Sequence, residues 1–133
     1  MMKKLVAVIT LSVFLAITVM QNFPQTANAT LIPIIIKMQQ DYEKAKNEGT
    51  KSPNGHTEEK EKSSLPAQGE KGLTSKDLVR DGKVTQRRYY DSDGKADMDI
   101  DYDHSNGDGS HTFPHRHKWS WPPVGPPSRG PGY

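Results

Sequence analysis

The clearest pattern of apolar and polar positions lies in the C-terminal half of the chain. Two runs, 84–91 and 95–103, flank Asp93 and Gly94, and an Asp-Gly pair between two such runs is a strong signal for a β-hairpin. The second run alternates strictly, which in a strand places successive side chains on opposite faces. One predicted face is apolar and the other carries carboxylates: Ala96, Met98, Ile100 and Tyr102 against Asp97, Asp99, Asp101 and Asp103.

The same hairpin predicts which side chains face these carboxylates. Either register of the turn places Gln86, Arg88 and Tyr90 on the aspartate face, and it leaves Arg87 and Tyr89 on the apolar face. Neighbouring carboxylates on one strand face lie about 6–7 Å apart and repel one another. A cation is therefore expected to balance them, and the candidates are Arg88, Arg116, Lys118 and a metal ion.

Composition divides the rest of the chain into parts. Residues 30–49 are predicted to form a short amphipathic helix, 50–72 a disordered, flexible linker, and 73–121 the ordered domain that holds the hairpin. Residues 122–133 are mostly proline and glycine and are expected to stay outside any sheet. The predicted fold class is α+β, a small β-hairpin-centred domain with one or two short helices, preceded by a signal peptide over residues 1–29.

Apolar residues recur at helical spacing in the segment 30–49: Ile35, Met38, Tyr42 and Ala45. Pro33 is expected to limit the start of this helix. The helix either covers one side of the domain or contacts a partner or a membrane. The linker has too few apolar residues to offset the entropy of ordering it, so His56 within it receives no role.

The N-terminal segment has the features of an export signal. Its positively charged start precedes a mostly apolar run of sixteen residues, 5–20, and the small-x-small sequence Ala27-Asn28-Ala29 follows, which is typical of a signal-peptidase site. Sixteen residues fall short of the roughly 20 that a membrane-spanning helix needs, so a retained anchor is the weaker alternative. We therefore predict a secreted (extracellular) protein, cleaved after Ala29 and not stably inserted in a membrane.

Composition narrows the chemistry that is available to this protein. There is no cysteine, which excludes thiolate catalysis and thiolate metal sites, so imidazole and carboxylate remain as ligands. Removing residues 1–29 takes away two lysines and no acid, and 18 − 2 = 16 basic residues then face 16 acidic ones. A nearly neutral chain gives no general attraction to nucleic acid or to an anionic membrane, so any such binding needs a local patch.

Four of the five histidines lie within fourteen residues: His104, His111, His115 and His117. The segment 112–121 reads as an extended strand, irregular or at an edge because of Pro114. A period of two places His115 and His117 on one side of it and Arg116 and Lys118 on the other. A pair of imidazoles on one side can hold a metal ion, or it can share general acid and general base roles near neutral pH.

Two sequence blocks stand out over about 78–121. The first, R-R-Y-Y-D-x-x-G-x-A-x-x-D-I-D-Y-x-H, is carried by Arg87, Arg88, Tyr89, Tyr90, Asp91, Gly94, Ala96, Asp99, Ile100, Asp101, Tyr102 and His104. The second, H-x-F-P-H-x-H-x-W, is carried by His111, Phe113, Pro114, His115, His117 and Trp119. Together these blocks resemble the C-terminal toxin domains of bacterial polymorphic toxin systems. The resemblance implies a secreted effector, in many cases a nuclease, that is paired with a cognate immunity protein.

The leading hypothesis is a metal-independent ribonuclease that acts on RNA through histidine acid–base chemistry. The acid–base residues would be His111, His115 and His117, with His104 in reserve. Arg88 or Arg116 would stabilise the phosphoryl oxygens, and Asp99 or Asp101 would orient a histidine.

Two alternatives use the same part of the chain. One is a hydrolase that depends on a divalent metal such as zinc or manganese, with an open position for water. The other is a non-catalytic secreted protein that binds a divalent metal or a surface partner through its Asp/His cluster. The candidate ligands in either case are Asp101, Asp103, His115 and His117.

Overall fold

The structure, a computed structural model of the chain, describes residues 25–103 and 114–133. The predicted signal peptide therefore lies outside the described residues over 1–24, and so do His104 and His111. The chain divides into two units, Met1–Lys37 and Met38–Tyr133, and the candidate site belongs entirely to the second. In the described part of the chain, no helix is both long enough and apolar enough to cross a membrane.

The only helix among the described residues, α2 (Gln25–Glu48), starts earlier than the sequence predicts and contains Pro33 in its interior. The prediction that Pro33 limits the start of the helix was wrong. A proline removes one backbone hydrogen bond and kinks a helix without having to end it. Gly49 follows the last helical residue at a positive φ of 76°, a conformation that suits glycine at a helix C-terminus.

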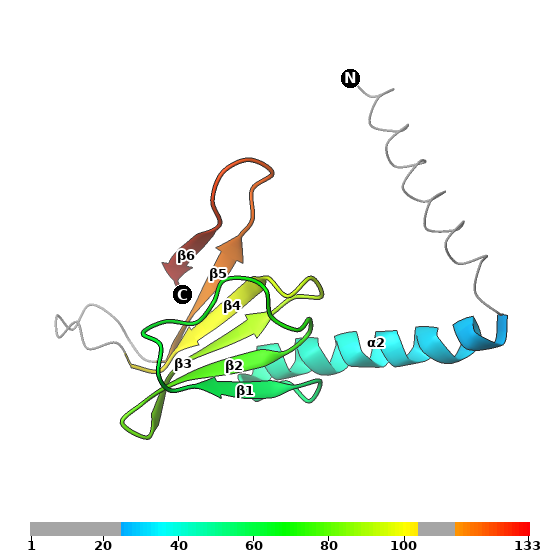
Figure 1. The fold of residues 1–133 in the computed structure, drawn as a ribbon, viewed down its shortest axis with the longest axis horizontal. Coiled ribbons are helices and arrows are strands. Elements are labelled where there is room, and N and C mark those ends of the chain that lie inside the picture. The colour runs from blue at the N-terminus through cyan, green and yellow to red at the C-terminus, as the bar shows by residue number, and fades with distance from the viewer. Residues whose placement is uncertain (1–24, 104–113) are drawn as a thin grey trace. The chain divides into compact units, whose positions relative to one another are not determined.

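Six strands form one mixed sheet in sequence order (Figure 1): β1 (His56–Glu59), β2 (Ser75–Arg80), β3 (Lys83–Tyr90), β4 (Ala96–Asp101), β5 (His115–Ser120) and β6 (Ser128–Gly132). The first two strands pair in parallel, and every later pair is antiparallel. The α+β class is confirmed. The predicted hairpin is β3–β4, with Gly94 in its turn at a φ of 72°.

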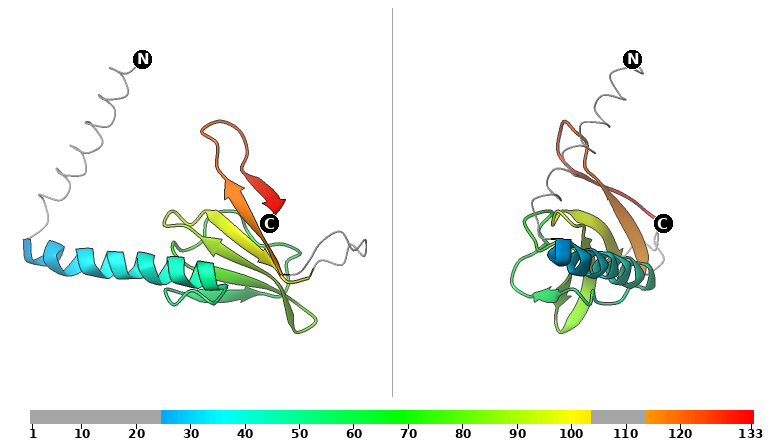
Figure 2. Two further views of the ribbon diagram at one scale, coloured as in Figure 1. Left: turned by 180° about the vertical axis from the view of Figure 1, so that it is seen from behind. Right: turned by 90° about the vertical axis from the view of Figure 1, so that its right-hand side faces the viewer.

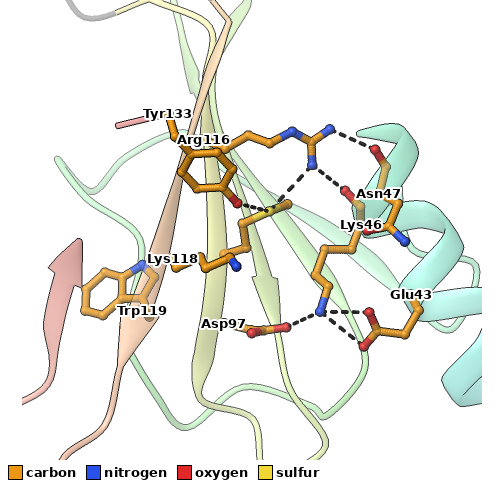
Figure 3. A pocket seen from close by; sticks show the side chains of 9 residues that line it. Glu43, Lys46, Asn47, Asp97, Arg116, Lys118, Trp119 and Tyr133 are labelled. Atoms are coloured by element: carbon orange, nitrogen blue, oxygen red, sulfur yellow. Dashed lines mark hydrogen bonds and ion pairs between the residues drawn. The ribbon is translucent and has the colours of Figure 1, made fainter. Parts of the chain in front are cut away.

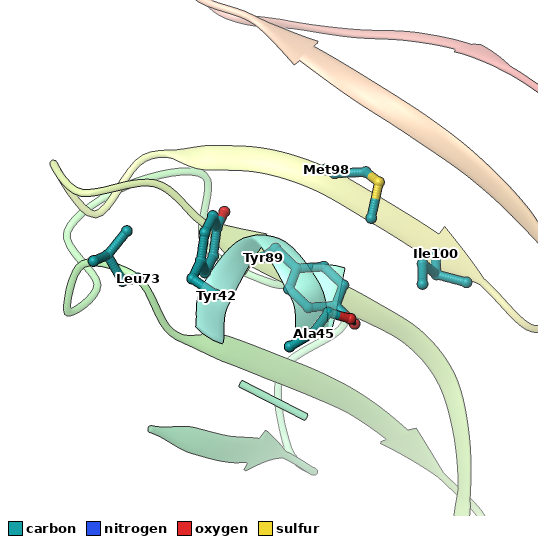
Figure 4. Packing of buried hydrophobic residues seen from close by; sticks show 6 residues of the cluster. All are labelled: Tyr42, Ala45, Leu73, Tyr89, Met98 and Ile100. Carbon is teal, nitrogen blue, oxygen red and sulfur yellow. The ribbon is translucent and has the colours of Figure 1, made fainter. Parts of the chain in front are cut away.

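The apolar core lies between the end of α2 and one face of the sheet, which we call the helix face (Figures 2 and 4). Tyr42 and Ala45 of the helix pack against Tyr89 of β3 and against β4. The Tyr89 hydroxyl donates hydrogen bonds to the carbonyl oxygens of Ala45 and Thr50, at 3.2 and 2.7 Å. The buried cluster is Tyr42, Ala45, Leu73, Tyr89, Met98 and Ile100. Its small size leaves much of the stability to polar contacts.

A β-bulge corrects the predicted face of one aspartate. The register shifts between Tyr89 and Tyr90, so that Tyr90 pairs with Ala96 while Tyr89 pairs with Met98. Because Asp97 is the extra residue, its carboxylate reaches α2, where it accepts hydrogen bonds from Tyr42 and Lys46 at 2.8 and 2.7 Å. The extra residue in a bulge interrupts the alternation of side chains between the two faces of the strand. Asp97 therefore faces α2, whereas Asp99 and Asp101 lie on the predicted aspartate face.

The predicted flexible linker over 50–72 is ordered in the structure, and that prediction was wrong. It contributes β1, and the connection from β1 to β2 crosses the sheet on the face opposite α2, which we call the loop face. The carbonyl oxygens of Leu65 and Pro66 accept hydrogen bonds from the Arg88 guanidinium at 2.7 and 3.2 Å. The Tyr90 hydroxyl donates to the Pro66 carbonyl at 2.8 Å. Hydrogen bonds to buried side chains thus compensate for the scarcity of apolar residues in this segment.

The prediction that the Pro/Gly-rich tail, 122–133, cannot join a sheet was also wrong. Strand β6 pairs with β5, and Arg129 lies opposite Trp119. Proline lacks an N–H group but is tolerated in an edge strand, where that position need not pair. Since β6 has only one neighbouring strand, Pro131 fits. The tail brings an arginine and two glycines onto the loop face beside the histidines.

Candidate metal centre

Three side chains of the kinds that bind metals meet on the loop face: Asp101, His115 and His117. Asp101 is the last residue of β4, and the two histidines lie on β5. The pairing of β4 with β5 sets Asp101 opposite His115 and Asp99 opposite His117. Two residues apart on one strand, the histidines share a face, as the sequence predicts. All three residues are buried, with 3% exposed for Asp101, 7% for His115 and 8% for His117.

The potential ligand atoms of this cluster lie within 4.8 Å of one another. The distance from Asp101 Oδ2 to His117 Nε2 is 3.3 Å, and that to His115 Nε2 is 3.7 Å. The imidazole rings meet edge to face, with centroids 4.8 Å apart. Ligands of one zinc ion, each about 2.0–2.2 Å from it, stand roughly 3.3 Å apart, so small side-chain movements would bring this set to coordination distance.

The hydrogen bond of His117 identifies which of its two ring nitrogens faces the cluster as a possible ligand. Its Nδ1 lies 2.8 Å from the carbonyl oxygen of Gly130 in β6, and because a carbonyl oxygen only accepts, Nδ1 carries a proton. In a neutral imidazole Nε2 then holds a lone pair. This atom is buried and has no hydrogen-bond partner of suitable geometry, although it lies 3.3 Å from the Asp101 carboxylate. A cation placed between this lone pair and the carboxylate would satisfy Nε2, which makes the pair a candidate for metal binding.

Asp101 is held in its ionised form. Burial by itself would raise the pKa of this carboxyl, but the hydrogen bonds from Gln86 and Arg129 and the charge of Arg129 hold the pKa below its ordinary value. Gln86 Nε2 donates to Oδ1 at 2.8 Å, and Arg129 Nη2 donates to Oδ2 at 2.5 Å. An ionised carboxylate is the form that binds a metal ion.

Arginines neutralise the aspartate face of the hairpin. Arg88 forms a bidentate pair with Asp99 at 2.6 and 2.8 Å, which confirms the predicted proximity of this cation. Arg129 Nε donates to the same carboxylate at 2.7 Å, so Arg129 bridges Asp99 and Asp101. Sequence reasoning missed Arg129 because it discounted the tail. The signal was present, since Arg129 is the one basic residue after Trp121 and the aspartate face requires cations.

Strand β6 also covers the two imidazoles. A Cβ built on Gly132 would lie 2.9 Å from His115 Cδ2 and 3.3 Å from His117 Cε1. Only glycine permits this approach, because 2.9 Å is shorter than the contacts that a real Cβ makes. The cluster is therefore enclosed by backbone atoms of β6 rather than by side chains.

Arg116, the second predicted phosphoryl-binding residue, lies on the helix face and away from the histidines. Its guanidinium donates to the carbonyl oxygens of Lys46 and Asn47 at the end of α2, at 2.7 and 2.9 Å. A cation there satisfies free helix carbonyls and interacts favourably with the helix dipole. Arg116 also borders a pocket of about 420 Å³ (Figure 3) whose lining includes Glu43, Lys46, Asp97, Lys118 and Tyr133. The pocket and the cluster are on opposite faces of the sheet.

The remaining predicted residues are divided between the site and its surroundings. Asp99 lies beside the cluster, but Arg88 and Arg129 engage its carboxylate, and it is not one of the three convergent ligands. Asp103 is exposed beyond the end of β4 and is likewise outside the set. The proposed roles of His104 and His111 lie outside the described residues.

A half-buried histidine on β1, His56, was assigned no role from the sequence. His56 of β1 contacts Ser75 Oγ through Nδ1 at 2.8 Å, and its Nε2 lies 3.3 Å from Asp77 Oδ2. Both oxygens of Asp77 already accept hydrogen bonds from Arg87, at 2.7 and 2.8 Å. His56 Nε2, like that of His117, has no hydrogen-bond partner. The group nevertheless offers one imidazole and a carboxylate whose two oxygens Arg87 already holds, and it does not form a set of three potential metal ligands among the described residues.

Comparison with protein-family models, with curated proteins and with solved structures gave no match. Functional reasoning about this chain therefore rests on the chemistry of the cluster.

Proposed function

We propose that the protein binds one divalent transition-metal ion through Asp101, His115 and His117. The observation that carries the proposal is the buried Nε2 lone pair of His117, which faces the Asp101 carboxylate without a hydrogen-bond partner. The hydrogen bond from His117 Nδ1 to a backbone carbonyl is the outer contact that metal-bound histidines usually make. Two imidazoles and one carboxylate suit zinc first and manganese second.

The burial of the histidines favours metal binding over a direct acid–base role. A general acid or base must come within about 2.6–3.2 Å of the atom that it serves, or act through one water. The side chains of His115 and His117 are 8% and 10% exposed and β6 covers both, whereas the side of the cluster at Arg129, which is 30% exposed, is more open to solvent. Ribonuclease activity, secretion and an immunity partner remain predictions from the sequence and from the toxin resemblance.

The proposal is tested by titrating the EDTA-treated protein with Zn²⁺ in a calorimeter at pH 7. We expect one site per chain, a rise in Tm on loading, and weaker binding at lower pH, because protons compete for the imidazoles. The double variant His115→Ala/His117→Ala should lose the site. His56→Gln removes a half-buried histidine that lies beside a different aspartate, and it should keep the site, which makes it a matched control.

Two outcomes would contradict the proposal. One is a wild-type protein without stoichiometric binding of Zn²⁺. The other is binding that persists in the double variant. Incubation of the same samples with RNA, with and without EDTA, tests the nuclease prediction separately. Cleavage that EDTA abolishes would extend the metal proposal to a hydrolase, whereas cleavage that survives EDTA and is lost in the double variant would favour acid–base chemistry.

A further inference from the structure

Among the described residues, the charges around the cluster already balance before a metal ion is added. Asp99 and Asp101 contribute two negative charges, and Arg88 and Arg129 contribute two positive charges at hydrogen-bond distance. Histidines that bind a metal through Nε2 are neutral. A divalent ion bound here would therefore bring two positive charges that the described neighbours do not offset.

A buried excess of positive charge is costly unless an anion accompanies it. The three ligands that the described residues supply also leave at least one position of a tetrahedral site to a further donor. Both arguments point to an anion from solution as the remaining ligand. They rest on the proposed metal site, and they specify what that site binds.

Arg129 is placed to recognise such an anion. Its Nη2 donates to Asp101 Oδ2, the same oxygen that lies nearest to both histidine Nε2 atoms. A metal ion bound to Asp101 Oδ2 competes with Arg129 for that oxygen and frees an N–H donor beside the metal. The Arg129 side chain is 30% exposed, whereas that of Asp99 is fully buried, so Arg129 marks the side of the cluster that is open to solvent.

We propose that loading the metal converts Arg129 from a counter-ion of Asp101 into a receptor for a phosphoryl group bound to the metal. A guanidinium beside a divalent ion matches the geometry and charge of a tetrahedral phosphate, which has enough oxygen atoms to bind the metal ion and the guanidinium together. A carboxylate has only two oxygen atoms, and if one of them binds the metal ion it cannot also accept both hydrogen bonds of the guanidinium. A free phosphate and the phosphodiester of a nucleic acid share this chemistry.

The test uses the visible absorption of Co²⁺ bound in place of zinc, titrated with inorganic phosphate and, in parallel, with acetate. In the wild-type protein, phosphate should change the Co²⁺ spectrum saturably and acetate should act more weakly. Arg129→Gln should bind Co²⁺ as tightly or more tightly, because a competitor for Asp101 is gone. Its phosphate affinity should fall by roughly ten-fold or more, the usual effect of losing a charge-assisted hydrogen bond.

The matched control is Lys118→Gln, which removes an exposed cation next to His117 on the opposite face of β5 and should change neither affinity. General damage to the fold would weaken both ligands, so opposite changes in Co²⁺ and phosphate affinity identify the proposed role. Failure of the wild type to bind Co²⁺ would overturn the metal site itself. Three outcomes would overturn the phosphoryl receptor alone. The spectrum of bound Co²⁺ could fail to change with phosphate, it could change equally with acetate, or its response to phosphate could be the same in Arg129→Gln as in the wild type. A dinucleotide in place of phosphate distinguishes a nucleic-acid source from the free ion.

Discussion

The substitution Arg87→Met tests whether buried ion pairs, rather than the small apolar core, hold the sheet together. Arg87 donates to Asp77 at 2.7 and 2.8 Å and to the carbonyl oxygen of Gly49 at 2.7 Å. Methionine leaves the fully buried Asp77 carboxylate without its cation, and breaking a buried pair in this way costs about 3–5 kcal/mol. The free energy of unfolding of the unit Met38–Tyr133, at about 0.05–0.15 kcal/mol per residue, is roughly 5–14 kcal/mol. The substitution should therefore remove a large part of it.

The assay is urea unfolding at pH 8, followed by the fluorescence of Trp119 and Trp121, whose stacked rings lie 6.5 Å apart in the same unit. The double variant Arg87→Met/Asp77→Leu is the decisive control. It removes both charges, so it should recover most of the loss. A loss below about 1 kcal/mol in the single variant, the value of an exposed pair, would refute the reasoning. So would a double variant that is no better than the single one.

Three further predictions concern other contacts. Burial lowers the pKa of His56 in the folded protein, so this histidine binds protons more readily in the unfolded chain. The free energy of unfolding should therefore be highest above about pH 6.5, the pKa of an unperturbed histidine, and fall as the pH drops toward the folded-state pKa. Urea midpoints measured from pH 8 to pH 5 should show this fall, and His56→Gln should reduce it. Gly132→Ala should push the imidazoles apart and weaken Zn²⁺ binding in calorimetry while costing about 1–3 kcal/mol of stability through overpacking; unchanged affinity would contradict it. Gly94→Ala places a Cβ against the Glu70 carbonyl and should lower Tm more than Gly82→Ala, which has a similar φ of 73° but open space around it.

Local patterns allowed the central hairpin and the shared face of the histidines to be predicted from the sequence. Strict alternation over 95–103 fixes which residues face together, and Asp93-Gly94 supplies a turn that needs a positive φ. The same reasoning correctly set Arg88 beside the aspartates. The bulge at Asp97 was beyond it, because the position of an extra residue depends on how both strands pack against α2.

The errors share a physical cause. The linker and the tail have few apolar residues. A prediction of disorder from composition considers only how much apolar surface a segment can bury, and it therefore misses order that comes from hydrogen bonds. Their order comes instead from hydrogen bonds to groups far away in the sequence. Leu65 and Pro66 accept from Arg88, and Gly130 accepts from His117. Hydrogen-bond partners that lie far apart in the sequence cannot be identified before the order of the strands in the sheet is known.

The fold contains a buried aspartate beside a histidine on each face of its sheet, and the two groups differ in how the carboxylate is shared. On the helix face, Asp77 gives both oxygens to one arginine, and His56 is the single imidazole beside it, with its Nε2 also left without a hydrogen-bond partner.

On the loop face, Arg129 must serve both Asp99 and Asp101. It therefore takes only one oxygen of Asp101, and that oxygen also faces two imidazoles. Each carboxylate group thus has one arginine per aspartate, but the sharing differs: arginine holds both oxygens of Asp77 and only one of Asp101. That difference, together with a second histidine, is what separates the cluster that we propose as a metal site from the group around Asp77.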